Sequence, residues 1–221
     1  MWSAIVVVLL WLGFAGSHVV LSSVMVRPRL IERLGLRGFL GLYSLVAFAF
    51  FVPLVWIYFA HKHAGPLLWS VPVPPAGRWL LYIGMGVAIT LNIAGFIQPS
   101  PASVAGGEAR VRGALRITRH PVFMGVALFG VLHLVPNGYA SDVAFFSGFP
   151  LFTVIGCWHQ DRRKLAAGLP GFRAFYEATP FFPFTGRQTW LGIREMFPTV
   201  IAIGVGVTIL VRYFHPVWFG G

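Results

Sequence analysis

Two histidines, His18 and His133, lie inside long apolar stretches of the sequence. Counted along a helix, His18 is about 13 Å from Arg27 and His133 is about 20 Å from Arg119, the basic residues that bound these stretches. An ionisable side chain inside an apolar span is costly, so such a residue is by default a candidate for function. Neutral imidazole is a good ligand for iron, zinc and copper. Two histidines at comparable depth on different helices therefore predict a metal or cofactor held between those helices.

The small number of ligand residues favours haem over zinc. Zinc sites use four protein ligands, or three and a water, and no third His, Cys, Asp or Glu lies at similar depth. A haem iron that already has four porphyrin nitrogens needs only two axial ligands. Cys157 is the single cysteine, which excludes a covalent Cys-x-x-Cys-His attachment. The sequence thus predicts a non-covalent b-type haem with His18 and His133 as bis-His ligands. A hydrogen bond to a neighbouring helix is the simpler alternative for each ring.

Further candidates for cofactor binding lie near the ends of the same stretches or within a span. Arg116 and Arg119 fall near the predicted inner face, where arginines can pair with haem propionates, and His120 has a structural or propionate-side role there. Asn92 lies mid-span and is the last candidate, with a helix–helix hydrogen bond as its alternative role. The other histidines can reach the headgroups and are predicted to be interfacial: His61, His63, His159 and His215.

Composition places the chain in a membrane. It has 221 residues, of which 57% are hydrophobic and 10% are charged, with a mean hydropathy of +0.77. Soluble domains average about 25% charged residues. The composition therefore excludes a disordered chain and an ordinary soluble enzyme, and it indicates an integral membrane protein.

Apolar segments of about 20 residues, the length that crosses a bilayer, recur along the chain. They predict an all-α, polytopic membrane helix bundle of about six transmembrane helices, at residues 2–26, 38–60, 79–97, 121–135, 143–158 and 193–211. The sequence Pro-Asn-Gly at 136–138 predicts a tight turn. Residues 67–77 and 98–107 are expected to be loops, and the Pro-interrupted aromatic segment 172–190 to lie at the interface. A single domain is expected over 1–221.

The basic residues predict the orientation of these spans. Of the 17 Lys and Arg, only Lys62, Arg78 and Arg212 fall on one side, and the others follow the first, third and fifth spans. The positive-inside bias places the basic loops in the cytoplasm and both termini outside. The net charge of +11 is explained by this topology and by contact with anionic headgroups of the lipid bilayer. No nucleic-acid partner is expected, because no basic helix or folded reader domain is present.

The most specific motif is Gly-Ala-Leu-Arg-Ile-Thr-Arg-His-Pro at residues 113–121. It is accompanied by Gly-Ser-His at 16–18, Leu-His-Leu at 132–134, Asn-Gly at 137–138 and Asp-Arg-Arg at 161–163. In these motifs the chain resembles the NnrU family of membrane proteins, which includes the plant and cyanobacterial 15-cis-zeta-carotene isomerase. The resemblance runs through most of the chain.

The resemblance implies a haem-dependent carotenoid cis–trans isomerase with His18 and His133 as the catalytic haem ligands. In the family, reduced haem drives isomerisation of the central double bond, and a ligand switch frees one iron site. A cysteine three residues before the second histidine is implicated in that switch, and Gly130 stands at this position here. Bacterial relatives are associated with denitrification, through nitrite and nitric oxide reduction. The resemblance therefore implies an apolar polyene or a small gas as the ligand.

Two alternatives come from other functional classes. The sequence Arg119-His120-Pro121 also occurs in S-adenosylmethionine-dependent membrane methyltransferases of the isoprenylcysteine and phospholipid type, which need a water-facing cofactor pocket near His120. A shared fold does not fix function. The other alternative is a non-enzymatic membrane scaffold, in which His18 and His133 only bond to neighbouring helices.

Overall fold

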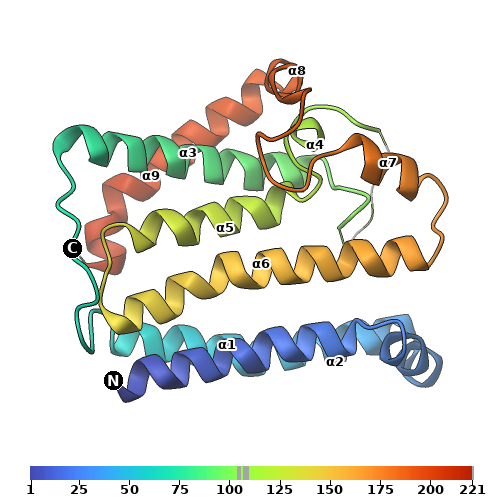
Figure 1. Cartoon of the computed structure of the whole chain (residues 1–221), viewed down its shortest axis with the longest axis horizontal. Coiled ribbons are helices and arrows are strands. Elements are labelled where there is room, and N and C mark those ends of the chain that lie inside the picture. Colours follow the sequence, from blue (N-terminus) through green and yellow to red (C-terminus); the bar gives the residue numbers. More distant parts are fainter. Residues whose placement is uncertain (104–105, 107–109, 221) are drawn as a thin grey trace. The chain divides into compact units, whose positions relative to one another are not determined.

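The structure, a computed structural model, describes residues 1–103, 106 and 110–220. The chain forms two compact units, of which unit 1 comprises Met1–Pro72 and His133–Arg163 and unit 2 comprises Val73–Leu132 and Lys164–Gly221. The single domain expected from the sequence stays a prediction. The helices in chain order are α1 (Trp2–Leu21), α2 (Val26–Ala60), α3 (Pro75–Ile97), α4 (Ala114–Ile117), α5 (Pro121–Leu134), α6 (Ala140–Ala166), α7 (Phe172–Ala178), α8 (Thr189–Glu195) and α9 (Pro198–Phe219) (Figure 1).

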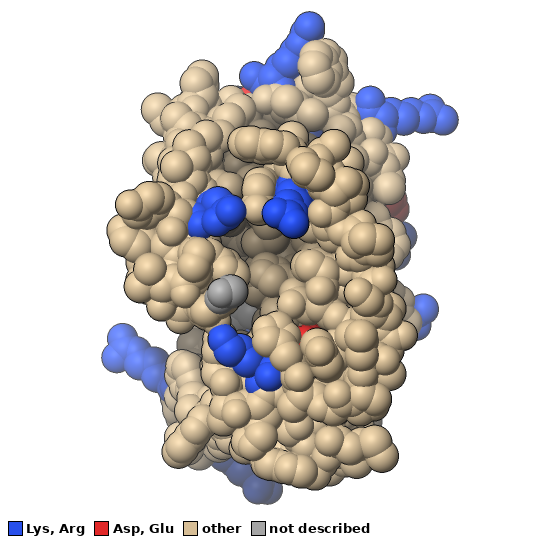
Figure 2. Space-filling model, turned by 90° about the vertical axis from the view of Figure 1, so that its left-hand side faces the viewer, with Lys and Arg blue, Asp and Glu red and all other residues tan. Residues whose placement is uncertain are grey.

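Five of the described helices, α1, α2, α3, α6 and α9, are long and apolar enough to cross a membrane. Helix α5 is apolar but has only 14 residues, as the short fourth segment predicted. The predicted all-α membrane helix bundle is thus confirmed, while the orientation of the termini stays a prediction from charge. Figure 2 shows a face made mostly of uncharged residues, with Lys and Arg in a few separate groups.

Several predicted span boundaries differ from the structure: α1 already ends at Leu21, α3 begins at Pro75, and α6 covers Ala140–Ala166. Helix α2 begins at Val26, whereas the sequence places its span at 38–60 and leaves 27–37 between the first two spans. Residues 26–34 are helical because Arg, Leu and Glu favour helix, and Gly35 interrupts the helix with a φ of 69°. Helix α9 begins at Pro198 and runs to Phe219, later than the predicted 193–211. Proline is favoured at the first position of a helix, where its missing N–H loses no hydrogen bond.

The segments expected to be loops or interfacial are largely non-helical. In the 67–77 segment α3 already begins at Pro75. Of the expected 98–107 loop, residues 104, 105 and 107 lie outside the described residues. The aromatic segment 172–190 contains the short helix α7 and the first residues of α8, with non-helical backbone between them.

Unit 1 is held together around Trp11 of α1. Its indole N–H donates to the Phe145 carbonyl of α6 at 3.1 Å, and its ring lies 5.0 Å from that of Phe149. Gly148 provides the space, since a Cβ at this position would lie 2.1 Å from the Trp11 ring. Small residues that let helices approach closely are typical of helix packing in membranes. Helix α1 therefore packs on the face of α6 that carries residues 145, 148, 149 and 152.

Unit 2 also has close helix–helix contacts at two glycines. A Cβ on Gly204 of α9 would lie 2.2 Å from the Thr90 hydroxyl of α3. A Cβ on Gly125 of α5 would lie 2.3 Å from the Asn92 amide nitrogen of α3. Close helix contacts at glycine thus join α3 to α9 and to α5.

Candidate functional site

His18 lies in the last turn of α1 and is oriented by its own helix. Its Nδ1 is 2.8 Å from the Phe14 carbonyl, which can only accept, so Nδ1 carries the proton. This tautomer leaves the lone pair on Nε2, and metal-ligating histidines are commonly oriented by the same hydrogen bond from the other ring nitrogen. The ring centroid lies 4.1 Å from that of Phe14, 4.7 Å from Tyr43 and 5.3 Å from Phe152. His18 therefore presents its Nε2 lone pair among three aromatic rings.

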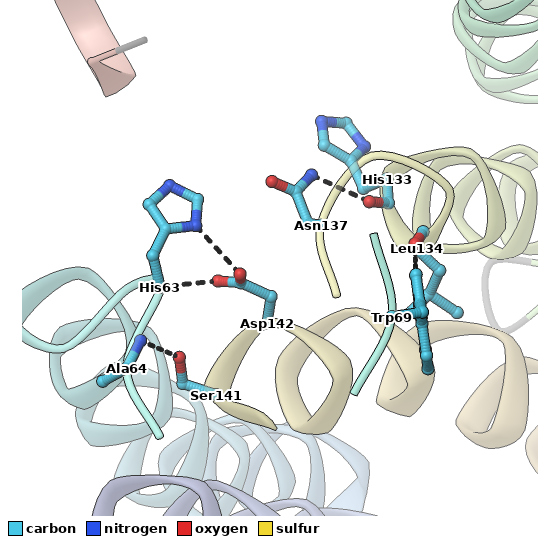
Figure 3. A network of polar contacts seen from close by, with 8 residues as sticks. All are labelled: His63, Ala64, Trp69, His133, Leu134, Asn137, Ser141 and Asp142. Carbon is cyan, nitrogen blue, oxygen red and sulfur yellow. Dashed lines mark hydrogen bonds and ion pairs between the residues drawn. The ribbon is translucent and has the colours of Figure 1, made fainter. Parts of the chain in front are cut away.

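His133 lies near the C-terminal end of α5, and its ring stacks on Phe146 of α6. The centroids are 4.6 Å apart and the planes differ by 16°. The His133 carbonyl accepts a hydrogen bond from the Asn137 amide at 2.8 Å, which caps this helix end (Figure 3). The predicted turn at 136–138 is thus confirmed, and it positions the second histidine.

The two imidazoles contact different residues of the same helix. His18 contacts Phe152 and His133 contacts Phe146, six residues earlier on α6. This separation corresponds to about 9 Å along a helix. Helix α6 thus lies beside both histidines, and their role as the two ligands of one haem stays a prediction.

A polar network that sequence reasoning missed lies beside His133, at the start of α6. The Asp142 carboxylate is fully buried and accepts from the backbone N–H of His63 at 3.1 Å and from its Nδ1 at 2.9 Å. The Ser141 hydroxyl accepts from the Ala64 N–H at 2.9 Å. Figure 3 shows these contacts joining the segment after α2 to the start of α6. An acidic residue at the edge of an apolar run was the signal that could have identified the network.

Trp69 completes this end of unit 1. Its indole N–H donates to the Leu134 carbonyl at 3.0 Å, directly after His133 (Figure 3). Gly138 lies against its backbone, where a Cβ would be 1.9 Å from the Trp69 carbonyl oxygen. Two hydrogen-bonded segments, 63–69 and 138–142, thus fix the turn that carries His133.

Asn92 and Arg116, two of the candidate cofactor residues, have partners inside unit 2. The Asn92 amide donates to the Ala88 carbonyl of its own helix at 2.8 Å and packs on Gly125. The Arg116 Nε donates to the Glu195 carboxylate at 2.7 Å, and its Nη1 donates to Gln188. Both side chains have structural roles here, and their contact with a cofactor stays a prediction.

Arg119 and His120 anchor the aromatic segment after α7. The Arg119 guanidinium donates to the Thr179 carbonyl at 2.7 Å and lies 4.2 Å from the centre of the Tyr176 ring. His120 is 3% exposed, and its ring centroid lies 5.5 Å from that of Phe181. The Arg-His-Pro motif therefore binds the interfacial segment to the start of α5. Sequence reasoning placed these residues at the inner face but did not find this segment as their partner.

A small cavity adjoins the same region and is lined by Ala94, Ile97, Gln98, Arg112, Gly113, Ala114, Glu195, Met196, Phe197 and Val200. Its volume is about 50 Å³. Pockets for small-molecule ligands have roughly 300–1,000 Å³. This cavity is therefore too small to hold the S-adenosylmethionine of the methyltransferase alternative.

Glu195 gives unit 2 a predicted dependence on pH. The hydrogen bond from Arg116 lowers the pKa of the Glu195 carboxyl, and the Gly113 N–H donates to it at 2.8 Å. A lowered pKa contributes stability that is present above the pKa of the unfolded chain and is lost as the pH falls through the lower, folded value. We expect the melting temperature of the wild type in detergent to fall in this acid range. The melting temperature of the Glu195→Gln variant should fall less over the same range.

The matched control for Glu195 is Glu177, whose carboxylate is 63% exposed and 3.6 Å from Arg173. Exposed pairs of this kind contribute little to stability. Glu177→Gln should therefore leave the acid dependence of the melting temperature unchanged. Equal profiles for the wild type and Glu195→Gln would contradict the role assigned to the Arg116–Glu195 pair.

The comparisons with known proteins agree with these motifs. The chain is 25% identical over 196 residues to the protein named 15-cis-zeta-carotene isomerase, chloroplastic, from Zea mays. That match covers 83% of this chain and 52% of the relative, so the chain spans about half the length of the curated relative. No solved structure matches the chain. The sequence model described as NnrU protein matches residues 6–221, and the chain therefore belongs to the NnrU family.

Proposed function

We propose that this membrane protein is a cis–trans isomerase of an apolar polyene, of the carotenoid class. The observation that carries the proposal is the similarity to 15-cis-zeta-carotene isomerase over 83% of the chain. A substrate of this kind dissolves in the bilayer, where the apolar helices of this chain reside. The proposal includes a location in the bacterial inner membrane, which rests on the resemblance to the bacterial branch of the family. The distribution of basic residues supports only the orientation of the spans.

The cofactor of the proposal is b-type haem, with His18 as the ligand that the fold already orients. The protonated Nδ1 of His18 leaves Nε2 for iron. His133, whose ring stacks on Phe146, is the second residue that would hold the haem. When bound and reduced, haem would supply electron density that weakens the double bond of a polyene.

The chain's own residues shape the surroundings of His18. Phe14, Tyr43 and Phe152 surround the imidazole with aromatic rings, which exclude water and offer flat faces to a conjugated chain. Gly16 lies two residues before His18, and a Cβ there would meet nothing within 4 Å. Gly130 has no side chain that could ligate iron, so a thiolate at this position takes no part in the proposed activity.

The experiment is expression of the chain in a carotenoid-producing bacterium that accumulates 9,15,9'-tri-cis-zeta-carotene, grown in darkness to exclude photoisomerisation. Chromatography of the extracted pigments should show the isomer with a trans central bond. Cells with the empty vector provide the background, and cells with the His18→Ala variant should match them. Conversion no greater than in the empty-vector cells, with the protein present and haem-loaded, contradicts the isomerase proposal. A small gas such as nitric oxide would then be the ligand to test.

A further inference from the structure

The C-terminal part of α6 within unit 1 carries two buried side-chain nitrogen atoms that have no hydrogen-bond partner within the described ranges. His159 and Arg163 are one helical turn apart and so lie on the same side of α6. The His159 Nε2 and the Arg163 Nε are both buried without a hydrogen-bond partner among the described residues. Leaving a buried donor unsatisfied costs about 1–3 kcal/mol. The Arg163 Nε–H is always a donor, and the His159 Nε2 is a donor in the tautomer that carries its proton there. Two such nitrogens one helical turn apart indicate that an acceptor from outside the chain belongs here.

The neighbouring helices of unit 1 contribute hydroxyl groups to this place. Ser22, which follows α1, lies near His159 of α6 and near Tyr43 of α2. The Ser22 hydroxyl also donates to the His18 carbonyl at 2.5 Å. Figure 1 shows the end of α1, the start of α2 and the later turns of α6 at one end of the unit. The site is therefore formed by three helices.

The charge at this place is uncompensated. Arg163 lies close enough to Arg27 for the two guanidinium groups to repel each other. In the part of the chain that the structure describes, neither arginine forms an ion pair with a carboxylate. Two like charges held together without a counter-ion are destabilising unless an anion joins them.

We propose that Arg27, Arg163 and His159 form a binding site for a phosphate group at the inner end of unit 1. Guanidinium groups bind phosphate through parallel, charge-assisted hydrogen bonds. The site lies at the ends of membrane-spanning helices on the side rich in Arg, where anionic lipid headgroups concentrate. The phosphate comes from such a headgroup or from free phosphate. This inference does not depend on the proposed isomerase activity.

The test uses the full chain purified in detergent and freed of lipid. Short-chain phosphatidylglycerol, short-chain phosphatidylcholine and inorganic phosphate are titrated separately, and affinity is read from the rise in melting temperature. Arg163→Gln removes the proposed ligand. Arg162→Gln is the matched control, because Arg162 is the exposed neighbour whose guanidinium lies over Trp158.

We expect phosphatidylglycerol to bind the wild type and the Arg162 variant equally, and the Arg163 variant about tenfold more weakly or worse. This factor corresponds to the loss of a hydrogen bond to a charged group. Binding of phosphatidylglycerol alone identifies a lipid headgroup, and equal binding of inorganic phosphate identifies a free phosphate. Wild-type protein that binds neither, or an Arg162 variant as weak as the Arg163 variant, overturns the site.

The lipid-free state provides a second readout. In lipid-free protein, Arg163→Gln should keep or raise the melting temperature. The substitution relieves repulsion from Arg27 and removes the buried Nε–H that has no acceptor among the residues that the structure describes. An arginine with a purely structural role would instead lower it. His159→Leu is the second variant, which removes the other unpaired nitrogen and should weaken phosphatidylglycerol binding in the same way. A His159→Leu variant that binds like the wild type contradicts the three-residue site.

Discussion

The His18→Ala variant is expected to purify without b-type haem, whereas the wild type is expected to show a Soret band near the low 400s nm and resolved α and β bands after reduction with dithionite. The Nδ1 of His18 is held by the Phe14 carbonyl at 2.8 Å, so Nε2 can bind iron, and three aromatic rings surround the imidazole. Haem content per protein, measured by the pyridine haemochrome method, should fall at least tenfold.

The controls are histidines at the ends of spans of the same unit. The His61 Nδ1 also hydrogen-bonds to its own helix, at the Ile57 carbonyl, 3.1 Å away, but its ring contacts Trp2 at the other end of α1 from His18. His61→Ala and His159→Ala should keep the haem. Equal haem content in the His18, His61 and His159 variants would contradict the assignment of His18 as a haem ligand. Absence of haem from the wild type, even after haem is supplied, would contradict haem as the cofactor.

The His133→Ala variant separates two forms of the haem site. If the His133 ring leaves Phe146 to bind iron, this variant loses the low-spin spectrum of a bis-His haem. If His133 stays stacked, the variant keeps the spectrum of the wild type. The spectrum therefore measures whether haem binding moves the end of α5 relative to α6.

The Trp11→Ala variant is expected to destabilise unit 1 by about 3 kcal/mol or more, the loss typical of a truncated buried Trp. Trp11 is 7% exposed, packs on Phe149 and Phe152 of α6 and donates to the Phe145 carbonyl. The alanine loses the packing contacts and the hydrogen bond together. The measurement is the melting temperature in detergent, followed by the fluorescence of the remaining tryptophans.

Trp56→Ala is the matched control, because Trp56 lies in the span α2 and is 72% exposed in the described structure. Its loss should leave the melting temperature nearly unchanged. Gly148→Ala tests the same contact from the other side, since the new Cβ would overlap the Trp11 ring. Overpacking typically costs about 1–3 kcal/mol. A stable Trp11→Ala variant, or a Trp56→Ala variant equally destabilised, contradicts the role of Trp11 as the contact between α1 and α6.

The sequence was sufficient where a property depends on neighbouring residues. Runs of apolar residues predicted the membrane spans, because the bilayer requires about 20 residues of a helix whatever the rest of the chain does. The Pro-Asn-Gly turn before α6 was predicted for the same reason, since turn geometry depends on local backbone preferences. Hydropathy does not register the backbone preferences of residues near Gly35 and Pro198. The boundaries of α2 and α9 predicted from hydropathy therefore differ from those in the structure.

Only the tertiary structure decided which polar residues meet. Depth along a helix selected His18 and His133, but it carries no information on the direction of a side chain around the helix axis, and the two rings contact different residues of α6. Asp142 hydrogen-bonds to His63, which is far from it in sequence, and Arg163 lies near Arg27, which is also far from it in sequence. Such contacts depend on the packing angles of whole helices, which are set by a few close approaches such as Trp11 against Gly148. The sequence by itself thus determined the class of the protein, its spans and its family motifs, while the partners of its buried polar groups were decided by the way the helices pack.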